Sequence, residues 1–313
     1  MRVSFSKMQG AGNDFIVVDE WLNEVVPEGR KPLFVSKVSD RHFGVGSDGV
    51  IFVQKSKKAD ANFVFYNPDG SRAEMCGNGI RCFAKFLYES KLVCRREMNV
   101  ETLAGVKKIL LNVKNGVVAG VTVGMGAPQL KRKEAQVAGR PEEVMVNEQV
   151  NIDGLNLRIT AVGMGNPHAI IFVDDVDLVD VVSLGRKVRH YNSLFCAPGG
   201  GAQKTLGKTE IRHYAKLFPK GINVHFIQQA GPNLFKIRTY ERGVEGETLA
   251  CGTGICASAV AAVLNKKANP AKPLTFQARG GLLEINLKMD GSKIKDVQMT
   301  GPAEKVFEGV YEF

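Results

Sequence analysis

Apolar residues recur at helical spacing directly after two cysteines, Cys76 and Cys251. The stretch GICASAVAAVLNKK, which begins at Gly254, is apolar on nearly every side, as in a helix that is buried all round. Its closing lysines suit the C-terminal end of a helix dipole. The pattern therefore predicts two helices, each entered at a cysteine. In the first helix the apolar positions follow at intervals of three and four on one face: Ile80, Phe83, Ala84, Leu87 and Tyr88.

Short β-branched and aromatic runs precede each cysteine. GVIFVQ ends at Gln54 and ANFVFY ends at Tyr66, and both have the composition that strands prefer. In the second half VHFIQ ends at Gln228, and a further strand ends at Tyr240. We therefore predict a two-strand hairpin in each half, followed by a polar, glycine-containing loop that leads to the cysteine and its helix.

These matches form an internal repeat. Upstream, GAGNDFIVVD resembles GMGNPHAIIFVDD, so that Asn13 corresponds to Asn166. The second copy carries about 21 extra residues between Asn166 and Gln228. VRHYNSLF, from Val188, recurs as IRHYAKLF, from Ile211, which indicates a small tandem duplication that enlarged a surface loop. Chance similarity over this short segment is the alternative.

The repeat predicts an α+β protein of two pseudo-symmetric domains. We expect each domain to be a curved mixed or antiparallel β-sheet, an open barrel, wrapped around a central α-helix. The first domain is expected to comprise residues 1–124 together with 302–313. The second is expected to comprise residues 125–301, with a loop insertion near 188–210. A chain of 313 residues is long enough for two domains with cores of their own.

Composition adds limits to this picture. With 44% hydrophobic and 24% charged residues, the chain has an ordinary soluble composition. No apolar run reaches the ~18 residues that indicate a membrane helix, and no signal peptide is evident. We therefore expect a cytoplasmic protein with no membrane partner. Six cysteines without a CxxC pair suggest neither a secreted disulfide framework nor a zinc site, so we expect no metal.

The net charge of +10 and the pI of about 9.3 admit anionic partners. The excess is diffuse, however, and its densest part, residues 131–143, mixes both signs as a solvated loop does. A basic surface that attracts small anionic substrates, or has no specific partner, is the simpler interpretation. We therefore expect no nucleic-acid partner.

A cysteine at a helix entry has distinctive chemistry. Unpaired backbone N–H groups and the helix dipole stabilise its thiolate, which lowers the thiol pKa below the ordinary value of ~8.5. The same N–H groups can hold a carboxylate. Two such ends that face each other suit inversion of a carbon, because a thiolate can remove a proton from one side while a thiol delivers one to the other. Each well-placed donor stabilises the developing carboxylate charge by about 3 kcal/mol, and no cofactor is needed if the two helix ends together stabilise it enough.

Seven motifs occur in a characteristic order from Lys7 to the C-terminus: KMQGAGNDF, RHFGVGSDG, YNPDGSRAEMCGNGIRC, GNPHAIIFVDD, LFPKGINVHFI, ERGVEGETLACGTG and VQMTGPAEKVFEGVYEF. In these motifs the chain resembles the diaminopimelate epimerase family. Those enzymes interconvert LL- and meso-diaminopimelate, without a cofactor, in lysine and peptidoglycan precursor biosynthesis. The resemblance implies an isomerase with a small-molecule substrate, a homodimer, and closure of the domains on the substrate.

The resemblance also implies the roles of individual residues. Cys76 and Cys251 would be the acid/base pair, with Cys76 as proton donor and Cys251 as acceptor in the LL-to-meso direction. His168 and Glu241 would support thiolate formation, and Arg242 would grip a substrate carboxylate while Glu241 receives an ammonium group. The helix-entry residues that would hold the reacting α-carboxylate are Gly77, Asn78, Gly252 and Thr253. The substrate-contacting asparagines would be Asn13, Asn67, Asn166 and Asn223.

Residue chemistry alone leaves simpler interpretations for several of these side chains. A lone asparagine in a turn is usually a turn former, and a lone histidine is often structural. The loop ERGVEGETLAC is also one residue longer than the family's ERGxGET pattern. For the insertion we favour a solvent-exposed loop over a lid or a dimer contact.

Three other functions compete with the epimerase interpretation. A proline racemase-like enzyme would share the architecture, and turnover of diaminopimelate against proline distinguishes the two. A non-catalytic amino-acid binding protein or thiol redox module would cause no exchange of the α-proton. A nucleic-acid binding protein would bind generic DNA with strong salt dependence.

Overall fold

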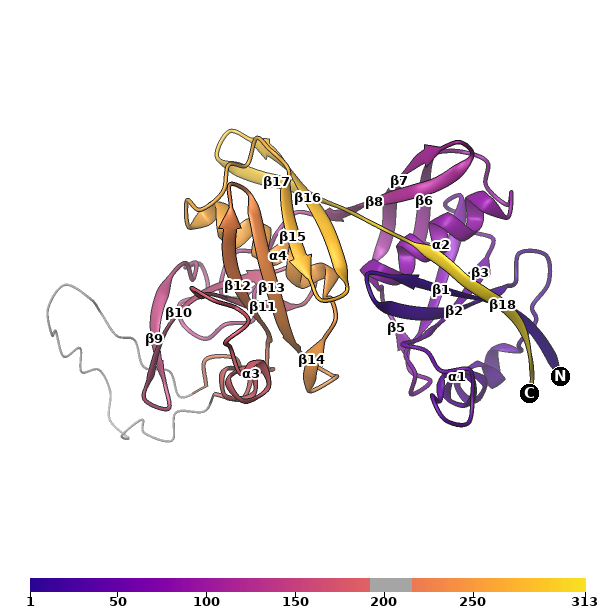
Figure 1. Cartoon of the computed structure of the whole chain (residues 1–313), viewed down its shortest axis with the longest axis horizontal. Coiled ribbons are helices and arrows are strands. Elements are labelled where there is room, and N and C mark those ends of the chain that lie inside the picture. The colour runs from indigo at the N-terminus through magenta and orange to yellow at the C-terminus, as the bar shows by residue number, and fades with distance from the viewer. Residues whose placement is uncertain (192–215) are drawn as a thin grey trace, which may run out of the picture. The chain divides into compact units, whose positions relative to one another are not determined.

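The computed structural model describes residues 1–191 and 216–313, which fall into two compact units (Figure 1). Strands dominate the described residues, with four α-helices among them. The mixed α+β class that the sequence predicts is therefore confirmed. Unit 1 comprises Met1–Met125, Gly280–Glu284 and Gln298–Phe313, and unit 2 comprises the described parts of Gly126–Arg279 and Ile285–Val297.

The secondary structure follows the same order of elements in the two units. The elements of unit 1 are β1 (Arg2–Gly10), β2 (Asn13–Asp19), the 3-10 helix η1 (Glu28–Arg30), α1 (Lys31–Ser39), β3 (Val50–Gln54), β4 (Ala61–Tyr66), β5 (Arg72–Ala73), α2 (Gly77–Glu89), β6 (Glu97–Thr102), β7 (Gly105–Lys114), β8 (Val117–Gly126) and β18 (Glu304–Glu312). Those of unit 2 are β9 (Glu148–Ile152), β10 (Leu155–Gly163), β11 (Pro167–Phe172), α3 (Val181–Arg189), β12 (Asn223–Gly231), β13 (Leu234–Glu241), β14 (Gly246–Thr248), α4 (Gly252–Leu264) and β15 (Leu274–Ala278). Two further strands, β16 (Gly281–Asp290) and β17 (Lys293–Gly301), contribute residues to both units.

The strands also pair in the same way in each unit. In unit 1, β1 pairs antiparallel with β2, β2 parallel with β3, β3 antiparallel with β4, and β4 antiparallel with β5 and parallel with β6. In unit 2, β10 to β15 repeat these pairings in the same order. Both predicted hairpins are confirmed, because Val50 pairs with Tyr66 and Val224 pairs with Tyr240 at matching places.

In unit 1 the strands carry apolar side chains on both faces, because a helix covers each face. Helix α2 packs against β1, β2, β3, β7 and β18. Along β3, Ile51 lies beside the Gly79 position of α2, whereas Phe52 packs on Phe34 of α1 with ring centroids 6.1 Å apart. In Figure 1, α1 and α2 accordingly lie on opposite sides of β1 and β2. Burial on both faces explains why GVIFVQ is continuously apolar rather than alternating.

In unit 2, α4 takes the place that α2 has in unit 1. It packs against β10, β11 and β12, and its residues from Gly254 to Ala262 are buried. The helix that the sequence predicts to be buried on every side is therefore confirmed. Helix α3 packs against β12, β13 and β14. Its Gly185 is required there, because a Cβ atom at that position would lie 2.4 Å from the Cβ atom of Tyr240.

Two sequence predictions fall partly outside the described residues. The insertion near 188–210 is described only as far as residue 191, and the repeat IRHYAKLF only from residue 216. Among the helices that the structure describes, none is both long enough and apolar enough to cross a bilayer.

Candidate active site

Cys76 is the N-cap residue of α2. Its backbone is extended, with φ −133° and ψ 118°, and its Sγ atom accepts a hydrogen bond from the Gly79 N–H at 3.4 Å. The next two residues, Gly77 and Asn78, are buried. The first turn of a helix has backbone N–H groups that the helix itself does not pair. The thiol of Cys76 therefore lies beside a group of donors suited to a carboxylate.

Two predicted substrate ligands meet at this helix entry. Asn78 donates a side-chain hydrogen bond to Asn13 Oδ1, and Asn13 Nδ2 donates one to Asp48 Oδ2 at 3.1 Å. Asn78 Oδ1 is buried and has no hydrogen-bond partner among the described residues. Because a buried acceptor without a partner is costly, a polar ligand that donated to this oxygen would remove that cost.

A charged network holds Asn13 from behind. Arg41 Nη2 bridges Asp14 Oδ1 at 2.8 Å and Asp48 Oδ1 at 2.6 Å, and Lys7 Nζ lies 2.5 Å from Asp14 Oδ2. Burial raises the pKa of Asp14, but hydrogen bonds from Arg41 and Lys7 outweigh burial and leave the pKa below its ordinary value. These four charged residues lie within KMQGAGNDF and RHFGVGSDG, and sequence reasoning did not single them out.

Asn67 occupies the turn between β4 and β5. Its backbone N–H donates to the Ser71 carbonyl at 2.8 Å, and its Nδ2 donates to Ser71 Oγ at 3.0 Å. The side chain is half-buried. In this structure Asn67 is therefore a turn former, with its amide directed at its own loop.

Cys251 is the N-cap residue of α4, in the same extended conformation as Cys76, with φ −118° and ψ 106°. It is 5% exposed, and its Sγ atom lies 3.7 Å from Thr253 Oγ1. The matching N-cap positions follow directly from the repeat of Cys-Gly-x-Gly-Ile in the two halves.

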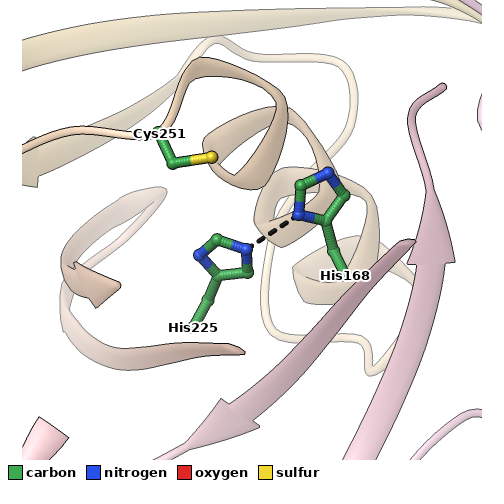
Figure 2. Close-up of side chains that lie close together, drawn as sticks. All are labelled: His168, His225 and Cys251. Atoms are coloured by element: carbon green, nitrogen blue, oxygen red, sulfur yellow. Dashed lines mark hydrogen bonds between the residues drawn. The ribbon is translucent and has the colours of Figure 1, made fainter. Parts of the chain in front are cut away.

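Two buried histidines lie beside Cys251 (Figure 2). His168 Nδ1 and His225 Nε2 are hydrogen-bonded at 2.8 Å. Their outer nitrogens also have partners, since His168 Nε2 bonds Asn166 Oδ1 at 2.8 Å and His225 Nδ1 bonds Thr239 Oγ1 at 2.9 Å. The acceptor at Asn166 assigns the proton of His168 to Nε2, so His225 Nε2 is the donor between the two rings.

Both imidazoles are held neutral. Burial is the main cause that lowers the pKa of His168 well below its ordinary value, and the positive charge of Arg242 lowers it further. Burial alone lowers the pKa of His225 to about 3. The two rings beside Cys251 are therefore polar but uncharged.

A glycine allows the helix to approach this pair. A Cβ atom at Gly254 would lie 2.0 Å from His225 Cε1, far inside van der Waals contact. The repeat aligns His225 with Ile51 and His168 with Phe15. The entry of α4 therefore lies against two imidazoles, whereas the equivalent positions in unit 1 are apolar.

The remaining predicted ligands of unit 2 lie at the start of β12 and around the end of β13. Asn223 is 2% exposed, and both ends of its amide are engaged: Nδ2 donates to the Pro167 carbonyl at 3.0 Å, and Oδ1 accepts from Arg242 N at 2.8 Å. It thus ties GNPH to the loop after β13. Glu241 Oε2 accepts from Thr248 Oγ1 at 2.8 Å. The Arg242 side chain is half-buried, with Nη1 3.5 Å from the Lys220 carbonyl.

The longer ERGVEGET loop forms a compact turn between β13 and β14, in which Glu241 pairs with Gly246. Val244 is exposed at its tip, and Glu245 has a positive φ of 56°. The Glu245 carboxylate bonds Arg189 at the end of α3 and accepts from the Gly243 N–H at 3.2 Å. The extra residue is therefore accommodated at the surface without displacing Glu241 from β13.

Each unit thus brings most of its predicted site residues together at one helix entry. Sequence reasoning missed His225 and Thr239, although His225 stands two residues after Asn223, on the same face of β12. Side chains two residues apart on a strand point to the same face, so the position of Asn223 could have indicated that His225 faces the site.

Comparisons with known proteins agree with these motifs. The family model for diaminopimelate epimerase matches residues 5–131 and 201–306. The chain is 40% identical over 309 residues to a diaminopimelate epimerase of Methanothermobacter thermautotrophicus, covering 98% of each chain. It is 42% identical over 311 residues to that of Archaeoglobus fulgidus, covering 99% of this chain and 96% of the relative.

Solved structures share the fold at low sequence identity. A PhzF-family phenazine biosynthesis protein of Bacillus anthracis matches with a TM-score of 0.68 at 16% identity, over 100% of both chains. A hydroxyproline epimerase of Agrobacterium vitis matches with a TM-score of 0.64 at 17% identity, over 99% of this chain and 91% of the other. With full-length relatives near 40% identity and a family model that spans most of its length, the chain belongs to the diaminopimelate epimerase family.

Proposed function

We propose that this protein interconverts LL- and meso-diaminopimelate by two-base proton transfer at the α-carbon. The observation that carries the proposal is the pair of cysteines, Cys76 and Cys251, each the N-cap of a buried helix in a chain about 40% identical to named diaminopimelate epimerases. We assign the catalytic halves to residues 1–124 with 302–313 and to residues 125–301. In this proposal each half is a curved sheet around one helix, and the common order of strand pairing supports it.

The chemistry follows from the two helix entries. In the LL-to-meso direction, the Cys251 thiolate takes the α-proton, and the Cys76 thiol delivers its own proton to the opposite side of the carbon. One C–H bond breaks and one forms, and the two cysteines exchange protonation states. The carbanion's charge spreads into the α-carboxylate, where the backbone N–H groups at Gly77, Asn78, Gly252 and Thr253 would stabilise it.

His168 and Glu241 are proposed as supporting groups at Cys251. The hydrogen-bonded pair of His168 and His225 places polar, uncharged rings beside the Cys251 sulfur, and polar surroundings favour the charged thiolate more than an apolar surface would. This asymmetry supports Cys251, rather than Cys76, as the base in the LL-to-meso direction, because the equivalent positions beside Cys76 are Phe15 and Ile51.

Substrate recognition is assigned to polar groups at the same two entries. Asn78 Oδ1, a buried acceptor without a described partner, suits an ammonium donor. Arg242 would pair with a substrate carboxylate, and Glu241 with an ammonium group. Asn223 would act by holding Pro167 and Arg242, since both ends of its amide are engaged by them. The asparagines completing the proposed set are Asn13, Asn67 and Asn166.

A cytoplasmic homodimer without a cofactor completes the proposal, as expected of the family. Turnover of LL-diaminopimelate, measured as formation of the meso isomer, tests the activity. The Cys76→Ala and Cys251→Ala variants should each lose epimerisation while remaining folded, and Cys94→Ala, at an exposed cysteine, should retain it. Turnover of proline but not of diaminopimelate would favour a proline racemase-like enzyme and contradict the proposal.

A further inference from the structure

The side chains around Cys251 combine three potential metal ligands in one buried cluster. One ligand atom each from His168, His225 and Cys251 lies within 4.8 Å of the other two. All three residues are buried. Figure 2 shows the sulfur of Cys251 directed toward the two imidazole rings, which are hydrogen-bonded to each other. Two imidazoles and a thiolate are ligands that zinc prefers.

We propose that His168, His225 and Cys251 bind zinc or a similar thiophilic divalent cation, and that this cation reversibly inhibits the enzyme. The binding itself depends only on the cluster. The inhibition rests on the proposed function, because a thiolate held by a metal cannot exchange a proton with substrate.

The geometry requires only small movements. Two nitrogens bound at ~2.0–2.1 Å to a tetrahedral zinc ion lie about 3.3 Å apart. His168 Nδ1 and His225 Nε2 are now 2.8 Å apart, so the rings must separate by about half an ångström. A sulfur at ~2.3 Å from zinc would lie about 3.5 Å from each nitrogen, which requires an approach of no more than about 1.3 Å.

The outer nitrogens already have the partners that ligating histidines need. Metal-bound histidines usually hydrogen-bond an oxygen through the nitrogen that faces away from the ion. Here Asn166 Oδ1 serves His168, and Thr239 Oγ1 serves His225. With Nδ1 of His168 and Nε2 of His225 as ligands, both outer partners can stay in place.

The protein scaffold also fixes the ligands before any ion arrives. His168 lies opposite Asn223 in the parallel pair β11–β12, and His225 follows two residues later on the same face. Gly254 leaves room for the His225 ring against α4. Asn166, which bonds His168, is half-exposed, and Gly165 beside it is exposed. Three protein ligands leave a fourth position open to water.

Zinc binding changes where the protons of Cys251 and His225 lie. Zinc binds the thiolate form of Cys251, so any proton still on the sulfur is released to solvent when the sulfur–zinc bond forms. His225 must carry its single proton on Nδ1 rather than on Nε2, and the Thr239 hydroxyl then turns from donor to acceptor. Each imidazole then binds the ion through a nitrogen that carries no proton, with its one proton on the outer nitrogen.

The other half of the molecule serves as an internal comparison. Its cysteine, Cys76, is also a helix N-cap, but the positions equivalent to the two histidines are Phe15 and Ile51. Neither side chain can bind a metal. The inference therefore predicts one strong site per chain, at Cys251, and not two.

Cobalt(II) titration of the full-length protein tests the binding without reference to activity. A tetrahedral site with one thiolate gives intense visible d–d bands and a near-ultraviolet sulfur-to-cobalt charge-transfer band. We expect these bands at one equivalent, and their displacement by zinc. Cys251→Ala should abolish the charge-transfer band, and Cys94→Ala should leave it unchanged. Absence of the bands from the wild type would overturn the proposal.

His225→Gln provides the discriminating variant. Loss of a ligand should weaken zinc binding by at least about 100-fold, since loss of an outer partner alone costs about 10–100-fold. Thr239→Val should weaken binding by about tenfold, and His190→Gln, at an exposed histidine of the same unit, should have no effect. Equal zinc affinity in the wild type and His225→Gln would show capture by thiols alone and would overturn the site.

Inhibition is measured as the zinc concentration that halves the epimerase rate. The reference for each variant is its own rate in metal-free buffer. We expect the half-inhibitory concentration to follow the zinc dissociation constants, and EDTA to restore activity. Cobalt binding without epimerase turnover in EDTA would reject the proposed function and leave the metal site intact. Epimerase turnover without cobalt binding would reject the metal site and leave the proposed function intact.

Discussion

The close approach of α4 to His225 gives a prediction in which two physical effects oppose each other. Replacing Gly254 by alanine adds a methyl group to a helix, and helix propensity alone predicts a gain of up to about 1 kcal/mol. The new Cβ atom, however, would lie 2.0 Å from Cε1 and 2.5 Å from Nε2 of His225. The ring cannot retreat without breaking its bonds to His168 and Thr239.

The magnitude follows from these terms. Overpacking of a filled core costs about 1–3 kcal/mol, and a buried hydrogen-bonding group left without a partner costs about 1–3 kcal/mol more. Against the propensity gain, we expect Gly254→Ala to lower the free energy of unfolding by about 3 kcal/mol. Urea denaturation followed by circular dichroism measures this change.

The repeat supplies a matched control for this substitution. Gly79 occupies the equivalent position of α2, where a Cβ atom would meet its nearest neighbours at 3.4 Å, which is ordinary contact. Gly79→Ala should therefore be neutral or stabilising by up to about 1 kcal/mol. If Gly254→Ala proved as stable as the wild type, or if both variants lost the same stability, the argument from the His225 contact would be wrong.

Three further substitutions follow from the charged and amide networks. Asp14 has a lowered pKa, so its ionised form stabilises the folded state above the ordinary pKa of 3.8, and this contribution is lost as the pH falls from there through the lowered pKa. Below about pH 4, urea midpoints should therefore fall more steeply for the wild type than for Asp14→Asn, and parallel curves would contradict this. Lys31→Met should cost about 3 kcal/mol because it leaves the buried Glu20 carboxylate without its cation, whereas Lys58→Met, at an exposed pair, should change stability by less than about 0.5 kcal/mol. Asn223→Ala should cost about 2 kcal/mol and raise KM, because it frees the Arg242 N–H and the Pro167 carbonyl; an unchanged KM would remove Asn223 from the recognition network.

The sequence was sufficient to predict the arrangement of the repeated elements. Hydrophobic spacing located both helices, and strand composition located the hairpins. Each pattern records which side of a helix or strand is buried, so it can be read from a short stretch of sequence. The pairing of Val50 with Tyr66 and of Val224 with Tyr240 is the structural counterpart of the equal spacing between glutamine and tyrosine in the two halves.

The contacts between motifs could not be predicted in the same way. His225 looks like one residue of an apolar strand, and only the parallel pairing of β11 with β12 brings it to His168. The glycine at 254 resembles helix punctuation until the ring beneath it is known. Likewise, the link from Asp48 through Asn13 to Asn78 joins three motifs that are distant in the chain. Long-range contacts of this kind depend on the tertiary fold rather than on local pattern.

The central claim is that two thiols act on opposite sides of one carbon, and deuterium transfer tests it most directly. LL-diaminopimelate is converted in D₂O, and early product and remaining substrate are analysed by mass spectrometry. Because a donor thiol equilibrates with solvent before substrate binds, the account predicts one deuteron at the inverted carbon of the meso product and none in the unreacted LL substrate. Inverted product that retains the original proton would contradict it, as would undiminished conversion by Cys76→Ala or Cys251→Ala.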